Sequence, residues 1–271
     1  MAIDVTAFTD VDSGDAPALI AYLDVCTRLA RSRKPADYAR QGIAPGMAVL
    51  DAGCGTGDDV RAIAELVGPA GRVAGVDSSR AMILAARQRG LPPNAEVRLA
   101  PAHAVPYPDR AFDLVRAERL FQHLAQPDAA ARELLRVLKP GGAITILDQD
   151  WQTMDVGGAD PELSGRIAGA FASSLANGRA GALHGAVLQR AGFREIESCA
   201  TRTTLPLGPA YALVLSTAVE TAKLSGALSA AQAEEWIASL LAANRRGAFS
   251  FAVTMHATHA RVGATSRPGC S

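Results

Sequence analysis

Nine residues decide how this chain is interpreted: Val49-Leu-Asp-Ala-Gly-Cys-Gly-Thr-Gly57. An apolar run leads directly into three closely spaced glycines, and a helix-forming segment follows at 58–67. Glycine lets the backbone turn tightly and pass close to a ligand, because it has no Cβ atom. The free N–H groups at the start of the next helix then point toward that ligand. The stretch therefore predicts a strand, a ligand-binding turn and a helix.

Outward from this turn, apolar segments alternate with helical segments over residues 47–147. Strands that are apolar throughout and alternate with helices indicate a parallel sheet covered on both faces. We therefore expect a doubly wound α/β fold whose ligand crevice lies beyond the carboxyl ends of the strands. The predicted strands are 48–52, 72–76, 96–99, 112–117 and 143–147, and the predicted helices between them are 58–67, 80–89 and 127–138.

Helical segments also flank this region. Residues 16–30 and a short helix ending near residue 42 precede it, and the segments 160–175, 183–191, 211–224 and 230–244 follow. Segments 194–203 and 249–262 have strand character, the second one antiparallel, and 206–209 has the composition of a turn. We expect a seven-stranded, mainly parallel, Rossmann-like sheet. Its domains would be an N-terminal helical lid (1–44), the Rossmann-like domain (45–205 and 248–263) and a helical cap insertion (206–247).

Composition excludes several classes of protein. Lys plus Arg and Asp plus Glu both number 27, and this zero net charge disfavours nucleic acid as a partner. Four scattered cysteines form no zinc or disulfide pattern, so we expect no metal. The start of the chain lacks the layout of a signal peptide, and no apolar run is long enough for a membrane span. These features favour a cytoplasmic protein with no membrane partner, and they permit a homodimer. The basic cluster 31–34 is expected to be solvated.

Two acidic residues end neighbouring predicted strands. Asp51 lies two residues before the first glycine, where a carboxylate suits a cationic ligand. Asp77 ends the second strand, and in doubly wound folds such a residue accepts hydrogen bonds from ribose hydroxyls. Met82 follows on the next helix, where its side chain can pack on a purine ring or join the core.

The segments 49–59 (VLDAGCGTGDD) and 73–82 (VAGVDSSRAM) resemble the cofactor site of class I S-adenosylmethionine-dependent methyltransferases. The similarity continues through 97–115 and 136–142, and it is greatest to the ubiquinone/menaquinone-type and natural-product small-molecule methyltransferases. The resemblance implies S-adenosyl-L-methionine as cofactor and a small-molecule partner as acceptor. The cofactor-binding residues that it implies, together with those argued above, are Asp51, Gly53, Gly55, Gly57, Asp77, Ser78, Met82, Ala102, His103, Ala117 and Glu118.

The resemblance also assigns parts of the cofactor to parts of this set. The glycine turn passes the methionine part, Asp77 holds the ribose, and Ala117-Glu118 meets the methionine amine. Ala102-His103 borders the adenine. The family commonly has an aspartate before position 102, whereas this chain has Pro101, so adenine recognition would use backbone groups or His103.

Candidate catalytic residues follow the fourth and fifth strands. His123, Glu118 and Asp148, in that order, are candidate general bases for an acceptor that arrives protonated. A histidine satisfied by the backbone is an equally open interpretation of His123.

Three residues are candidates for contact with the acceptor: Arg119, Asp150 and Trp151. Trp151 could stack on a planar substrate or a cation, and the alternative is a polar loop with a packed tryptophan.

The predicted activity is methyl transfer by direct in-line displacement, with a quinone-like or secondary-metabolite acceptor methylated on O, N or C. The alternatives are an NAD(P)-dependent oxidoreductase and a non-catalytic regulatory protein that binds S-adenosylmethionine. Oxidoreductases of this fold use GxGxxG, whereas this chain has GxGxG followed by Asp58-Asp59, which suits a pyrophosphate poorly. His256 and His259 are three apart in a predicted strand and so point to opposite faces, which excludes a shared metal.

Overall fold

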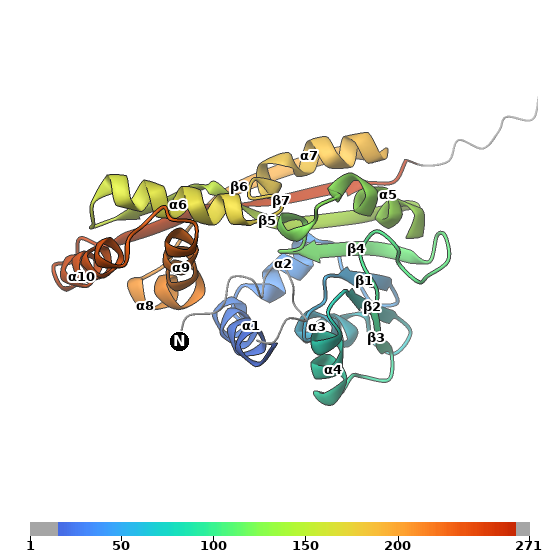
Figure 1. Ribbon diagram of the computed structural model, residues 1–271. Coiled ribbons are helices and arrows are strands. Elements are labelled where there is room, and N and C mark those ends of the chain that lie inside the picture. The colour runs from blue at the N-terminus through green and yellow to red at the C-terminus, as the bar shows by residue number, and fades with distance from the viewer. Residues whose placement is uncertain (1–15, 264–271) are drawn as a thin grey trace, which may run out of the picture.

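The computed structural model describes residues 16–263, and within them a seven-stranded sheet runs through the molecule (Figure 1). The strand order is β3-β2-β1-β4-β5-β7-β6. The first five strands are parallel, and β7 is antiparallel to both β5 and β6. The strands are β1 (Ala48–Ala52), β2 (Arg72–Asp77), β3 (Ala95–Leu99), β4 (Phe112–Glu118), β5 (Leu138–Gly157), β6 (Arg194–Thr204) and β7 (Ser250–Arg261).

The helices fall close to the predicted segments. Two precede the sheet, and the remainder lie between or after its strands (Figure 1). They are α1 (Ala16–Ala30), α2 (Lys34–Arg40), α3 (Asp58–Val67), α4 (Arg80–Gln88), α5 (Pro127–Val137), α6 (Pro161–Ser174), α7 (Ala180–Ala191), α8 (Leu207–Ala210), α9 (Ser216–Leu224) and α10 (Ala230–Arg245), with a single 3-10 turn, η2 (Phe121–His123), and a π-helical turn, η3 (Tyr211–Leu215).

The parallel part of the sheet is covered on both faces, as predicted. Successive residues of β1 point to opposite sides, so Val49 packs with α3 while Leu50 packs with α5 and α7. Every residue of β1 is buried. This double covering explains why the central strands are mostly apolar on both of their faces.

The fifth strand is four times as long as predicted. The predicted strand 143–147 followed by a polar loop is wrong, because antiparallel pairing with β7 continues from Ala143–Arg261 to Gly157–Ser250. One irregularity, between Asp150 and Asp155, interrupts this register. The far ends of β5 and β7 carry a second apolar cluster with α6, η3, α9 and α10. Figure 1 shows these long strands reaching away from the parallel part of the sheet.

The helices between β6 and β7 form one excursion from the sheet. The predicted turn at 206–209 is wrong: Pro206 is the N-cap of α8, and that helix continues through η3 into α9. Proline is compatible with a helix start because the first N–H groups have no partner within the helix. Ser229 and Gln232 form a capping box that begins α10.

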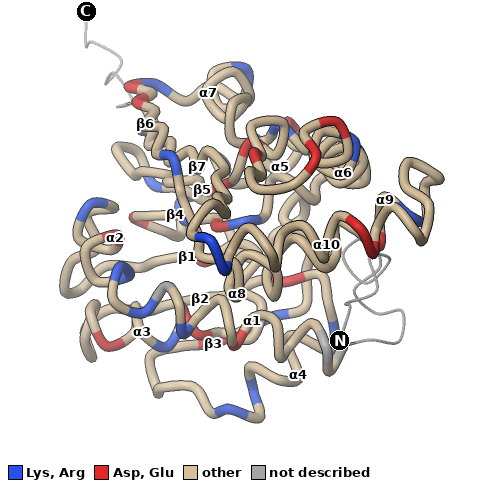
Figure 2. The backbone as a smooth tube through the Cα atoms, turned by 90° about the vertical axis from the view of Figure 1, so that its left-hand side faces the viewer, with Lys and Arg blue, Asp and Glu red and all other residues tan. Residues whose placement is uncertain are grey.

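Acidic and basic residues are interspersed along the backbone, as Figure 2 shows, which accords with the zero net charge. Among residues 16–263, no helix combines the length and the apolar character that crossing a bilayer requires.

Candidate active site

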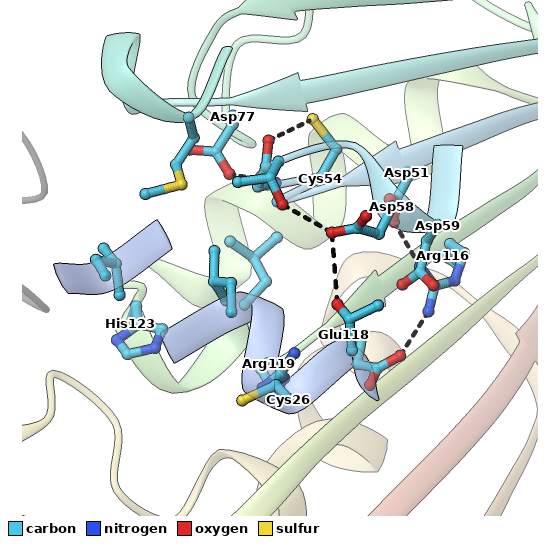
Figure 3. A pocket seen from close by; sticks show the side chains of 18 of the residues that line it. Cys26, Asp51, Cys54, Asp58, Asp59, Asp77, Arg116, Glu118, Arg119 and His123 are labelled. Carbon is cyan, nitrogen blue, oxygen red and sulfur yellow. Dashed lines mark hydrogen bonds and ion pairs between the residues drawn. The ribbon is translucent and has the colours of Figure 1, made fainter. Parts of the chain in front are cut away.

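A cavity of about 210 Å³ opens at the carboxyl edge of the parallel strands. Helix α1 lies along one side, the glycine turn, the ends of β1, β2 and β4 and the turn η2 form most of the rest, and the first turns of α2, α3 and α4 complete the lining. Figure 3 shows the side chains around it. Nine of the predicted site residues line this cavity: Asp51, Gly53, Gly55, Asp77, Ser78, Met82, Glu118, Arg119 and His123.

The other predicted site residues lie elsewhere. Gly57 is the N-cap of α3, Ala117 is buried inside β4, Ala102 is buried and His103 is exposed. Asp148, Asp150 and Trp151 lie within β5 rather than in a loop after it, because that strand continues along β7.

The structure requires glycine at each of the three positions of the turn, but the requirement differs between them. All have positive φ angles, +75°, +50° and +74° in chain order, which L-residues rarely adopt. A Cβ atom on Gly53 or Gly57 would also lie 3.1 Å from a neighbouring side-chain atom. On Gly55 the nearest atom would be Cδ1 of Leu23 in α1, at 3.4 Å. Gly55 is therefore the glycine whose missing side chain keeps the cavity open beneath α1.

Asp77 is fixed at the end of β2 by the backbone around it. Its Oδ2 accepts a hydrogen bond from Gly55 N and its Oδ1 accepts one from Ser79 N, both at 2.9 Å. Each carboxylate oxygen can accept a further hydrogen bond, so the group can still receive hydroxyl donors from a ligand. Met82, which is 2% exposed, lines the cavity from α4 beside this acid.

Arg116, which the sequence analysis did not predict as a site residue, organises a cluster of three acids, two of which it did predict (Asp51 and Glu118). Its guanidinium is 1% exposed; Nη1 donates to Asp51 (2.9 Å) and Asp59 (2.6 Å), and Nη2 donates to Glu118 (2.7 Å). In Figure 3 these acids surround Arg116, while His123 lies on the other side of the drawn cavity. A lone arginine inside an apolar strand was the available signal, because a charge is buried there only when it is paired.

Helix α2 is tied to this same cluster. Lys34 Nζ donates to Asp59 (2.8 Å) and Glu118 (2.5 Å), and Tyr38 Oη donates to Asp59. The expectation that Lys34 belongs to a solvated basic cluster is therefore wrong, because two partly buried carboxylates attract it. Since Asp59 lies in the first turn of α3 and Glu118 ends β4, Lys34 joins the N-terminal helices to two elements of the site.

Burial and pairing act differently on the pKa values of these acids. Burial raises the pKa of Asp51 to about 7, and the nearby Arg116 only partly offsets this effect. Burial also acts on Glu118, but Lys34 and Arg116 outweigh it and hold the pKa of that carboxyl below its usual range. Five acids line the cavity (Asp51, Asp58, Asp59, Asp77 and Glu118) against three permanent cations (Lys34, Arg116 and Arg119). The cavity therefore favours a positively charged ligand.

Asp148 supports the turn η2 from inside the protein. Its fully buried carboxylate accepts hydrogen bonds from Phe121 N (3.2 Å) and Gln122 N (3.3 Å), and it lies 3.1 Å from Nε2 of His184. It does not line the cavity. The expectation that Asp148 meets the acceptor as a base therefore does not fit its position.

Trp151 and Asp150 also serve the protein interior. Trp151 packs edge-on against Phe171, with ring centroids 4.9 Å apart, and its Nε1 donates to Gln122 Oε1 at 2.9 Å. Asp150 accepts from Gln152 N at 3.1 Å. Of the two interpretations, a packed tryptophan is the one that the geometry supports; neither residue lines the cavity.

Within residues 16–263 no group of three or more His, Cys, Asp or Glu side chains is arranged to hold a metal ion. His259 instead lies with its Nδ1 3.0 Å from the hydroxyl of Thr145.

Comparison with known proteins agrees with this geometry. A family model described as a methyltransferase domain matches residues 43–175. An uncharacterised 37.1 kDa protein in transposon TN4556 of Streptomyces fradiae is 33% identical over 252 residues, covering 89% of this chain and 70% of that protein. The ubiquinone/menaquinone biosynthesis C-methyltransferase UbiE of Hydrogenovibrio crunogenus is 40% identical over 111 residues, 40% of this chain. The chain spans only 44% of that enzyme's length.

The fold has a solved counterpart in phosphoethanolamine N-methyltransferase 2 of Haemonchus contortus in complex with S-adenosyl-L-methionine. The TM-score is 0.54 with 19% identity, covering 86% of this chain and 53% of the other. Sequence, sheet order and family model agree, and the chain belongs to the class I S-adenosylmethionine-dependent methyltransferases.

Proposed function

We propose that this protein transfers a methyl group from S-adenosyl-L-methionine to a small molecule by direct in-line displacement. The observation that carries the proposal is the placing of Gly55 and Asp77 on a cavity with an excess of acids. A glycine turn gives access to a ligand, a fixed carboxylate receives hydroxyls, and the acids attract a cation.

These features fit the cofactor part by part. Asp77 would accept hydrogen bonds from the ribose, and Met82 would pack against the adenine. Asp51 and Glu118 would face the positive methionine end. Ala102 and His103 lie outside the cavity lining, so we give them no direct contact. This assignment of contacts is part of the proposal.

The bound cofactor supplies a methyl group already activated by its sulfonium, so the protein needs to align the acceptor and exclude water. Helix α1 covers the cavity with Leu19, Tyr22, Leu23 and Cys26. Alignment of this kind contributes up to about 7–11 kcal/mol in favourable cases.

The side of the cavity beneath α1 suits a small, largely apolar acceptor. Its lining there is mostly apolar, and Arg119, Gln122 and His123 are the polar residues that the turn after β4 contributes. We propose a quinone-like or secondary-metabolite acceptor. The relative named for ubiquinone and menaquinone biosynthesis matches only 40% of this chain, so the choice of acceptor rests on the cavity.

Calorimetry with the purified chain tests the cofactor directly. We expect S-adenosylmethionine and S-adenosylhomocysteine to bind and NAD to bind far more weakly. Tight binding of NAD alone would reject the proposal. Methyl transfer to members of a broad acceptor panel would distinguish an enzyme from a protein that only binds the cofactor.

Replacing the fixed acid gives a sharper test. Asp77→Ala removes a charged hydrogen-bond acceptor, worth roughly 1.5–3 kcal/mol, so the dissociation constant for S-adenosylmethionine should rise by about 10- to 100-fold. The matched control is Asp155→Ala, because Asp155 is a surface acid on β5 paired with Arg202. An unchanged dissociation constant in Asp77→Ala would remove the ribose assignment.

A further inference from the structure

Three side chains form a chain of hydrogen bonds that ends at the cavity. Trp151 Nε1 lies 2.9 Å from Gln122 Oε1, and Gln122 Nε2 lies 3.0 Å from His123 Nε2. Trp151 is buried away from the cavity, whereas Gln122, which is 6% exposed, and His123 both contribute to its lining. The hydrogen bond between Trp151 and Gln122 is buried, so its donor and its acceptor have to match one another.

The indole fixes the orientation of the Gln122 amide. An indole N–H can only donate, so the atom that it meets must be an acceptor, which is the amide oxygen. In the reverse orientation the indole N–H would face the amide NH₂ group. Two buried donors would then oppose each other, at a cost of roughly 1–3 kcal/mol for each unsatisfied group. The amide oxygen consequently faces Trp151.

The amide in turn fixes the imidazole. With its oxygen toward Trp151, Gln122 presents its NH₂ group to His123 Nε2, and an NH₂ group can only donate. His123 Nε2 must therefore offer a lone pair. We propose that Trp151 and Gln122 are positioning residues that hold His123 as the neutral tautomer with its proton on Nδ1, so that His123 is a hydrogen-bond donor and not the general base.

The consequence for catalysis rests on the proposed function, whereas the tautomer does not. A neutral imidazole accepts a proton only at its unprotonated nitrogen, and in His123 that nitrogen is engaged by Gln122. Whatever His123 Nδ1 contacts, it contacts as a donor. The acceptor would then be methylated in the ionisation state in which it arrives, with no proton removed by this histidine.

The surroundings of His123 agree with a neutral ring. Burial lowers the pKa of His123, and the positive charge of Arg119 at the end of β4 acts in the same direction. Asp148 in β5 opposes them, but its carboxylate is occupied by the η2 backbone and by His184 from α7. The titratable and charged groups that act on His123 are therefore Arg119 and Asp148, and the net effect disfavours the imidazolium.

Long-range ¹H–¹⁵N correlation spectra of the ¹⁵N-labelled full chain report the tautomer of each histidine ring. The His123 signals are identified by their loss in His123→Asn. Between pH 6.5 and 8 we expect the wild-type ring to be neutral with Nε2 unprotonated. Gln122→Glu supplies a carboxylate that accepts from both Trp151 and His123. In that variant we expect a proton on Nε2 and a rise of at least one unit in the pKa of His123.

The matched control is Gln152→Glu, which makes the same change of charge at an exposed position of β5 and should leave the His123 spectrum unchanged. Trp151→Phe keeps a ring against Phe171 but removes the donor, and it should lower the population of the Nδ1–H form. A wild-type ring with its proton on Nε2, or Gln122→Glu spectra that match Gln152→Glu, would overturn the proposal. If Gln122→Glu does not fold, the wild-type and Trp151→Phe spectra still decide it. None of these measurements requires methyl transfer, so failure of the proposed function would show separately.

Discussion

Among single residues, Asp51 is the cavity acid whose charge changes near neutral pH. Burial raises its pKa to about 7, while Lys34 and Arg116 keep Asp59 and Glu118 ionised. A cationic ligand favours the ionised form of Asp51, so its binding releases a proton from the fraction of molecules in which that carboxyl is protonated.

The affinity for S-adenosylmethionine should therefore depend on pH. Below pH 7 the Asp51 carboxyl is mostly protonated, so binding of the cation has to release that proton. Above pH 7 the carboxyl is mostly ionised, and no proton has to be released. The affinity should therefore rise between pH 6 and pH 8. Its slope should be at most about tenfold per pH unit, and the plot of affinity against pH should level off above about pH 7. Calorimetry across this range measures the effect. Asp51→Asn should flatten the profile, and a flat profile in the wild type would contradict the assignment.

The glycine turn permits a test with a well-matched control. Gly55→Ala and Gly90→Ala both place a Cβ atom at a positive φ angle, at +50° and +78°, and each costs roughly 1–2 kcal/mol of stability. Gly90 has no atom within 4 Å of such a Cβ and lies outside the cavity lining. We expect Gly55→Ala to weaken cofactor binding at least tenfold and Gly90→Ala to leave it unchanged. Equal affinities would show that Gly55 does not face the ligand.

At this scale the sequence predicted the residues that follow strict local rules. Asp51, Gly55 and Asp77 belong to a strand-turn-helix pattern with fixed spacing, and all three line the cavity. Arg116 and Lys34 were missed because most of their partners are distant in the chain: Asp51 is 65 residues from Arg116, and Asp59 is 25 residues from Lys34. Only the tertiary structure shows which charges meet.

At the scale of elements, α2 is attached to the site mainly through polar contacts. Lys34 is the first residue of this helix, and it joins Asp59 of α3 to Glu118 of β4. Tyr38, one turn later, adds a hydrogen bond to Asp59. Helix α1, which covers the cavity, precedes α2 by only three residues, so loosening α2 should loosen that cover.

Lys34→Met should therefore destabilise the protein by up to about 3 kcal/mol, because two partly buried carboxylates lose one of their two cations and keep only Arg116. Urea unfolding measures the change, and limited proteolysis within residues 16–40 should become faster. Arg33→Met is the control, since the neighbouring Arg33 is 45% exposed and, among the residues that the structure describes, pairs with Asp37, a surface contact worth up to about 1 kcal/mol. Similar losses in the two variants would argue against a special role for Lys34.

The length of β5 shows where local patterns stop being informative. Residues 143–147 are apolar apart from Thr145 and predict a strand, whereas 148–157 mixes acids, glutamines and apolar residues. The second part is a strand because β7 pairs with it, and β7 lies about a hundred residues later. Pairing with β7 places Asp148 and Trp151 inside the protein rather than at the cavity. The residue pattern of segment 148–157 alone does not predict this pairing.

At the scale of the whole molecule, three apolar clusters share one sheet. Two cover the parallel strands, and the third lies at the far ends of β5 and β7 with α6, α9 and α10. Trp236, which is 1% exposed, lies in the third cluster and donates its Nε1–H to Ser164 Oγ at 3.0 Å. The cavity is lined by none of the residues in this cluster.

Trp236→Ala should therefore separate stability from cofactor binding. Removing a buried tryptophan costs about 3–5 kcal/mol, which urea unfolding would record, while the folded protein should bind S-adenosylmethionine with unchanged affinity. Leu224→Ala, at a residue that is 72% exposed, is the control and should change stability by no more than about 0.5 kcal/mol. A loss of affinity in Trp236→Ala would mean that the far cluster shapes the cavity.

The excursion between β6 and β7 begins and ends at adjacent points, because Thr204 pairs with Ala252. Its π-helical turn η3 contacts α1, the helix that covers the cavity. A connection whose ends are already neighbours can grow or shrink at small entropic cost, about 0.6 kcal/mol for each doubling of its length. Homologous chains can thus lengthen, shorten or exchange this entire segment, in evolution or by gene shuffling, while every strand keeps its register.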